Sequence, residues 1–297
     1  MAVYKHRYSR YAGEATAQWQ RFLILPRYAY RKVFQSKLFT IFFVICFVVP
    51  LGAAVMIYLK NNLSALDMLR LPVDSIFSID VSFFSTLLAI QGVFAFILTA
   101  LVGPGLVSPD LTNNGLALYL SRPFSRTEYL LGKASVLLIL QSCVTWVPLL
   151  LLYLLQASLA DSGWMASHGR IVVAIFLGAW VWMAIITLLA LAISAWVRWR
   201  SIAAALLFGV FFVSAGFGEA VKGILWTRWG GLFNLNQLIR TVWAWLFTGN
   251  LAESVAGEHN ADLGAIPVWS AWVMLLLVAA FCLLLLSRRI RAYEVVR

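Results

Sequence analysis

Histidine and cysteine are the side chains of this sequence best suited to metal or redox chemistry, and their spacing favours neither. The three histidines fall in separate segments, with no cysteine or carboxylate beside them at the spacing of metal ligands. The three cysteines each lie inside an apolar run, where cysteine usually acts as a small buried hydrophobe. These residues are His6, His168, His259, Cys46, Cys143 and Cys282. The sequence therefore predicts no metal site, no cofactor and no disulfide.

Ionisable residues are absent from the middle of the apolar runs, where proton relays and ion-coupled sites usually place them. The sequence contains no cluster of His, Asp or Glu residues of the kind that a membrane-embedded enzyme would need. The phosphate-binding pattern G-x-x-x-x-G-K-[ST] does not occur either. We expect the chain not to be an enzyme, and any ATP hydrolysis that drives it to take place in a separate protein.

One polar stretch between two apolar runs carries a dense set of helix signals. It is "VSPDLTNNGLALYLSRPFSRTEYLLGK", residues 107–133, which we call the elbow. Ser108 is suited to cap a helix, Pro109 to occupy its first position, and Asp110 to complement the helix dipole. The apolar positions that follow are Leu111, Leu116, Leu118 and Leu120. The pattern predicts a short helix that begins at Ser108.

The second half of the elbow predicts a turn and a new helix. Pro123 disfavours helix at the preceding residue, so the first helix should end near Arg122. Ser125 and Glu128 form a capping box directly before an apolar run. The elbow is thus either a structured functional surface or simply a well-capped connector between two helices.

The elements around the elbow are those of an integral membrane protein. Hydrophobic residues make up 62% of the chain and charged residues 12%, far from the composition of a soluble domain. Each apolar run has about the 20 residues that a helix needs to cross hydrocarbon, without the alternation of barrel strands. The runs are 38–59, 81–103, 134–155, 171–197, 202–221 and 266–286. The predicted fold is all-α and polytopic, with six transmembrane helices.

The basic residues give this architecture an orientation. Seventeen of the 23 Lys and Arg residues fall in the N-terminal segment, the elbow, the connection after the fourth run and the C-terminal tail. Both termini should therefore be cytoplasmic. The net charge of +11 is then a signal of topology and of contact with membrane lipids. The basic residues are split among separate loops, which argues against nucleic-acid binding.

Two further segments have amphipathic helical spacing. Residues 17–37 precede the first run and predict a helix lying on the inner leaflet, interrupted at Pro26; the alternative is a simple extension of the first span. Its apolar stripe is Trp19, Phe22, Leu23, Pro26, Tyr30, Val33 and Phe34, with Arg21, Arg27, Arg31 and Lys32 elsewhere. Residues 235–247 predict an external helix that rests on the outer leaflet or caps the bundle.

The domain organisation that follows is simple. Residues 1–37 form a cytoplasmic segment with the interfacial helix, 38–287 the six-helix transmembrane domain, and 288–297 a basic cytoplasmic tail.

Inside the runs, Gln91, Gln141 and Thr145 are expected to form interhelical hydrogen bonds; a substrate-lining role is the alternative. Glu219 and Lys222 are spaced for an i,i+3 pair. Small residues of the fifth run could allow close helix approach: Gly209, Ser214, Ala215, Gly216 and Gly218.

With these elements in place, the sequence resembles the permease of a type-2 ATP-binding-cassette (ABC) exporter over nearly its whole length. The best local match is Gly105 to Lys133, where a short helix carrying Gly115 leads to "LYLSRPFSRTEYLLGK". The interfacial helix, the six spans and the helical external loop agree with that family. Many members carry Glu-Arg where this chain has Asp110 and Leu111, so an ion pair proposed there for others does not carry over intact.

The resemblance implies that the elbow is a coupling helix, through which a separate ABC ATPase subunit moves the spans. It also implies a permease dimer, formed with a second copy or a homologue, in the bacterial cytoplasmic (inner) membrane. The implied coupling residues are Asp110, Asn114, Gly115, Leu116, Leu118, Arg122, Pro123, Ser125 and Arg126. The other open alternative is a non-transporting membrane anchor or regulatory subunit. The cargo cannot be read from the sequence.

Overall fold

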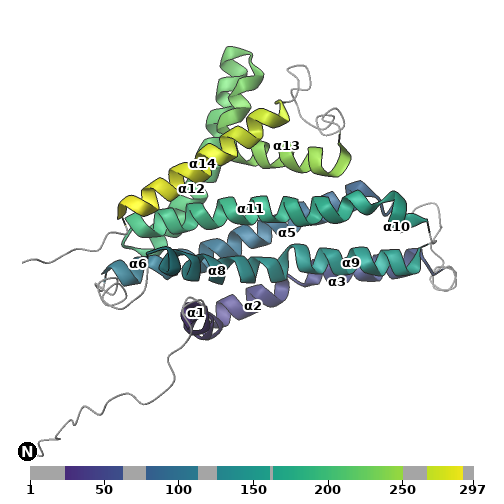
Figure 1. The fold of residues 1–297 in the computed structure, drawn as a ribbon, viewed down its shortest axis with the longest axis horizontal. Helices are drawn as coiled ribbons and strands as arrows, with labels where there is room; N and C mark the ends of the chain where they lie inside the picture. Colours follow the sequence, from purple (N-terminus) through teal and green to yellow (C-terminus); the bar gives the residue numbers. More distant parts are fainter. Residues whose placement is uncertain (1–23, 63–77, 113–125, 161–162, 250–265, 290–297) are drawn as a thin grey trace, which may run out of the picture.

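The structure is a computed structural model that describes residues 24–62, 78–112, 126–160, 163–249 and 266–289. All regular elements in these ranges are helices, as Figure 1 shows. They are α1 (Ile24–Phe34), α2 (Lys37–Ile45), α3 (Val48–Lys60), α5 (Val81–Val102), α6 (Pro104–Thr112), α8 (Arg126–Val144), α9 (Trp146–Leu159), α10 (Trp164–Ser167), α11 (Gly169–Trp196), α12 (Arg200–Leu225), the 3₁₀ helix η3 (Arg228–Phe233), α13 (Leu235–Thr248) and α14 (Val268–Arg289).

Six helical stretches in the described ranges are long and apolar enough to cross a membrane, which confirms the all-α polytopic fold. They are Lys37–Lys60, Val81–Asp110, Thr127–Leu159, Gly169–Trp196, Arg200–Leu225 and Val268–Arg289. The second stretch continues seven residues beyond the apolar run that predicts it, and the third begins seven residues earlier. The two stretches therefore extend into the elbow from both sides.

The first span bends where a proline removes a backbone donor. Pro50 in α3 has no N–H, so the carbonyl of Cys46, four residues earlier, lacks its usual helical partner. The side chain of Gln91 on α5 supplies it: its Nε2 donates to the Cys46 carbonyl over 3.1 Å. The predicted interhelical role of Gln91 is confirmed, and the break between α2 and α3 is tied to the second span.

A second polar contact joins the middle of three spans. Gln141 on α8 donates from Nε2 to the hydroxyl of Thr99 on α5 over 2.5 Å, and its Oε1 accepts from Thr187 on α11 over 3.2 Å. The Thr145 hydroxyl instead lies 2.8 Å from the Gln141 carbonyl of the same span and 3.5 Å from the sulfur of Met183 on α11, and its one proton is shared between them. In hydrocarbon such bonds hold helices together because no water competes for the polar groups.

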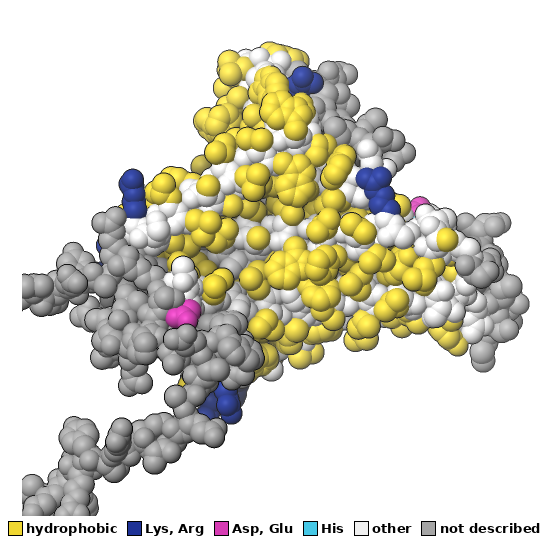
Figure 2. Space-filling view, viewed as in Figure 1, with side chains coloured by type: hydrophobic (Ala, Val, Ile, Leu, Met, Phe, Trp, Pro, Cys, Tyr) yellow, Lys and Arg dark blue, Asp and Glu magenta, His cyan; other side chains and the backbone are white. Residues whose placement is uncertain are grey.

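Helix α11 is the central element, and it contacts α5, α6, α8, α9, α12, α13 and α14. In Figure 1 it runs the length of the bundle, while α12 and η3 project from one side. Figure 2 shows a broad apolar surface, with the visible Lys and Arg side chains at its margins. This distribution suits helices that face lipid along their length and polar surroundings at their ends.

The predicted amphipathic segment 235–247 is confirmed as helical, within α13. It begins at Asn234, whose side chain accepts from the Gln237 amide, and ends at Gly249, whose φ of 80° lies in the left-handed region. Its predicted apolar positions, Leu235, Leu238, Ile239, Val242, Trp243 and Leu246, are all buried. Because α13 packs on α11 and α14, it covers one side of the bundle and is not a detached surface helix.

Helix α1 agrees with the predicted amphipathic stripe from Pro26 onwards. Tyr30 and Val33 are half-buried, Arg31 and Lys32 are exposed, and the Tyr30 hydroxyl donates to carbonyls of α8. Pro26 lies in the first turn of the described helix, where a missing N–H removes no helical bond. The part of the prediction before Ile24 lies outside the described residues.

The structure also bears on the predictions made for the fifth span and for the cysteines. Gly218 lies against η3 and α13, because a Cβ there would come within 2.8 Å of the Asn234 Cβ. Gly209 and Gly216 mark no close approach to another described residue, because a Cβ on either would have none of these residues within 4 Å. The Glu219 and Lys222 side chains form the predicted i,i+3 pair at 3.1 Å, although Lys222 is buried. The three cysteines are free thiols; Cys46 and Cys282 are buried as predicted, whereas Cys143 is exposed, so the predicted burial is wrong for that residue.

Candidate functional site

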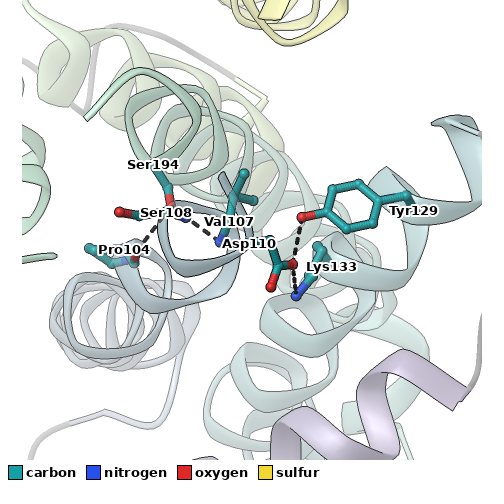
Figure 3. A network of polar contacts seen from close by, with 7 residues as sticks. All are labelled: Pro104, Val107, Ser108, Asp110, Tyr129, Lys133 and Ser194. Atoms are coloured by element: carbon teal, nitrogen blue, oxygen red, sulfur yellow. Dashed lines mark hydrogen bonds and ion pairs between the residues drawn. The ribbon is translucent and has the colours of Figure 1, made fainter. Parts of the chain in front are cut away.

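The most buried ion pair of the described residues lies at the entry to the elbow and joins two spans. Lys133 Nζ on α8 lies 2.8 Å from Asp110 Oδ2 on α6, and the Tyr129 hydroxyl donates to the same oxygen over 2.8 Å (Figure 3). Tyr129 and Lys133 are four residues apart, so both face α6 from one side of α8. We call these three residues the clamp.

Burial makes the clamp a strong constraint. The Lys133 and Asp110 side chains are 11% and 19% exposed, and Tyr129 is fully buried. The Lys133 ammonium also lies 5.5 Å from the centre of the Tyr129 ring. Each charge is therefore paired and hydrogen-bonded, whereas either one left alone at this burial would carry a large desolvation cost.

A second contact fixes α6 to the central helix. Ser194 on α11 donates its hydroxyl to the Pro104 carbonyl over 3.0 Å and accepts from the Ser108 amide over 3.0 Å (Figure 3). Pro104 and Ser108 are four residues apart, the spacing that an ideal helix would pair directly. The Ser194 hydroxyl is thus inserted beside the backbone ladder of α6, and it also accepts from the Val107 amide. Movement of α6 must therefore carry α11 with it.

The connection between α11 and α12 closes the same region. The Ser108 hydroxyl donates to the Arg198 carbonyl, and the Arg200 guanidinium donates to the Leu101 carbonyl over 2.6 Å. Leu101 is among the last residues of α5, where carbonyls have no helical partner. A Cβ on Gly103 would come within 2.9 Å of the Ala190 Cβ, so the α5–α6 junction rests directly on α11. Four helices are locked together at this end.

The predicted helix start at Ser108 is wrong. Helix α6 begins at Pro104, so Ser108 lies inside it and its hydroxyl bonds to Arg198 instead of capping. Pro104 takes the first helical position, which suits a residue without N–H as well as Pro109 would. Pro109 lies inside the helix, directly after the Ser108 amide that donates to Ser194.

The predicted coupling residues can be followed only in part. Asp110 belongs to the clamp, and Arg126 is the first residue of α8, which agrees with a helix start directly after Ser125. The others lie outside the described residues: Asn114, Gly115, Leu116, Leu118, Arg122, Pro123 and Ser125. Asp110 does form an ion pair, but its partner is Lys133 and not the following residue, which in this chain is a leucine.

Sequence reasoning missed Tyr129, Lys133 and Ser194 as parts of this site. The spacing of Tyr129 and Lys133 in "EYLLGK" places two polar groups on one face of a helix that is otherwise apolar, and this was the available signal. Ser194 gives no such signal, because one serine in an apolar run usually bonds to its own helix.

The arrangement is mechanical in character. In the ranges that the structure describes, no group of three or more His, Cys, Asp or Glu residues lies close enough to hold a metal ion. No known protein-family model matches the chain, and no curated protein matches it either.

Proposed function

We propose that the chain is the transmembrane permease subunit of an ABC exporter and that the elbow receives the force of a separate ATPase subunit. The observation that carries the proposal is the rigid linkage at the base of the elbow. The clamp joins α6 to α8, and Ser194 joins α6 to α11. A push on the elbow is thereby delivered to three spans at once.

The mechanism follows from this linkage. ATP binding and hydrolysis occur in the partner, and closure of two ATPase subunits displaces the elbows that contact them. The elbow connects two spans: the second, made of α5 and α6, and the third, made of α8 and α9. A displacement of the elbow therefore tilts both spans. Rigid-body motion of this kind underlies alternating access in transporters. A closed two-fold assembly requires two permeases and two ATPases.

A non-transporting anchor or regulatory subunit is the second candidate. The same linkage would then only stabilise a connector, and no transport would depend on ATP. The two candidates differ in whether an ABC ATPase binds the elbow.

Isolation of the chain from its native membrane tests the ATPase partner. We expect an ABC ATPase, recognised by its G-x-x-x-x-G-K-[ST] motif, to be present in equal amount. Leu116→Asp or Leu118→Asp should reduce co-isolation by about 5-fold or more, because a carboxylate buried in an apolar contact costs about 1–3 kcal/mol. The control is Leu159→Asp, at the end of the third span that is remote from the elbow. This variant should retain the ATPase. Equal amounts of ATPase with all four proteins would contradict the coupling role.

The proposed location is the bacterial inner membrane, with both termini and the elbow in the cytoplasm. In a variant without the native cysteines, a cysteine at Ser287 should react with a membrane-impermeant thiol reagent only after the cells are opened. Cysteines at Asn62 and Ser167 should react in intact cells. The reverse pattern would place the elbow outside and rule out a cytoplasmic ATPase there.

A further inference from the structure

A cavity of about 280 Å³ lies beside the clamp, between α1, α2, the α5–α6 junction, α8 and the start of α12. This volume is close to the lower end of small-molecule sites, roughly 300 Å³. Its polar lining includes Lys32, Asp110, Lys133 and Arg200, and its floor includes Gly105. The mechanical role of the elbow does not require an open space here.

The ends of the surrounding spans show at which level of the membrane the cavity lies. The first and fifth spans begin at Lys37 and Arg200, the second ends at Asp110, and the third begins at Thr127. In Figure 1 the labels of α1, α6 and α8 lie toward the same end of the molecule. Span ends lie where hydrocarbon gives way to lipid headgroups. The cavity therefore lies at the level of the phospholipid phosphates.

The charge of the lining favours an anion. Three cations face one carboxylate, and the Asp110 carboxylate is already bound to Lys133 and Tyr129. Neither Lys32 nor Arg200 forms an ion pair with another described residue. The Arg200 guanidinium is held by the Leu101 carbonyl, and a Cβ on Gly105 would lie 3.5 Å from its Nε. The lining thus offers two positive charges, one of them fixed in position.

Most of the remaining lining is apolar. It includes Val33, Leu38, Phe39 and Leu106, and Leu38 is 63% exposed. A small soluble anion gains nothing from such a wall, whereas the glycerol and first methylenes of a lipid would be shielded by it. Polar and apolar surfaces therefore meet in one cavity, as an amphiphilic ligand requires.

We propose that this cavity binds the headgroup phosphate of an anionic phospholipid, with Lys32 and Arg200 as its cationic partners. An anionic lipid fits better than a zwitterionic one, because a headgroup ammonium would meet an excess of positive charge. The bound lipid would join α1 and α2 to the clamp end of the bundle. This site is independent of the ATPase partner proposed above.

The test is native mass spectrometry of the full chain in detergent, titrated with phosphatidylglycerol or phosphatidylcholine. Wild type should bind phosphatidylglycerol more tightly. Each cation removed by Lys32→Gln or Arg200→Gln should weaken phosphatidylglycerol about fivefold, the contribution of one basic group near anionic lipid. Gly105→Leu, which keeps every charge but fills the cavity, should weaken both lipids.

The matched control is Arg288→Gln with Arg289→Gln, which removes two cations at the end of α14 and outside the cavity. It should keep the affinity of wild type, and a thermal melt of each variant separates lost binding from lost folding. Equal binding of the two lipids, or equal weakening in the control, would overturn the proposal. Displacement of the lipid by millimolar inorganic phosphate would show that the cavity takes a soluble anion, which would also overturn it.

Discussion

Lys133→Met is expected to lower the free energy of unfolding by about 3–5 kcal/mol, the cost of leaving one charge of a buried pair without its partner. Of the two partners that the described residues give the Asp110 carboxylate, which is 19% exposed in wild type, the Tyr129 hydroxyl alone would remain. The measurement is denaturation of the purified chain in mixed detergent micelles. A destabilised clamp should also loosen α6 from α8 and reduce any ATP-driven transport.

The Lys133 prediction has an internal control in a second variant. Lys133→Met combined with Asp110→Asn should be more stable than Lys133→Met alone, because the unpaired carboxylate is gone. Lys222→Met provides a matched comparison, since its partner Glu219 is 52% exposed and stays solvated. That change should cost about 1 kcal/mol or less. If Lys133→Met and Lys222→Met had equal effects, the clamp would not be the constraint described.

Trp243→Ala is the second change with a large expected effect, about 3–5 kcal/mol for the loss of a buried aromatic side chain. The Trp243 indole donates to the Gly178 carbonyl of α11 over 2.9 Å, and its ring would lie 3.0 Å from a Cβ on Gly92 of α5. It also packs edge-to-face on Trp182. Removal of this side chain leaves a cavity between α13 and two spans.

Trp245→Ala, two residues further along α13, is the control for Trp243. Its side chain is 39% exposed, so its loss should cost about 1 kcal/mol or less. Thermal denaturation in detergent compares the two variants directly. A similar small effect of both would mean that α13 rests on the bundle without being wedged into it.

Hydrophobic pattern predicted the six spans because each run is long enough for the membrane and polar breaks separate the runs. The helices of two spans extend beyond their apolar runs. Hydropathy falls at Pro104 and before Ala134, yet helix continues to Thr112 and begins at Arg126. The extra turns of α6 are held by tertiary contacts that no local signal contains, whereas the early start of α8 agrees with the capping box of Ser125 and Glu128.

The site was predicted in part for the same reason. Asp110 was identified from its position near a helix start, but its partners are 19 and 23 residues away on another helix. Ser108 has the type and neighbours of a helix cap, and only the approach of the α11–α12 connection decides that its hydroxyl bonds to Arg198. Long-range pairs of this kind follow from packing, which a single sequence does not reveal.

The central claim is that the elbow transmits ATPase-driven motion into the spans. Spin labels on Asn62, just after α3, and on Ser167, the last residue of α10, report a distance between two spans. Both labelled residues are far from the elbow in the sequence. In the complex isolated with its ATPase, ATP should shift the distribution of this distance, and Lys133→Met should suppress the shift while the ATPase stays bound. A distance that is unchanged by ATP in a wild-type complex that hydrolyses ATP would contradict the claim.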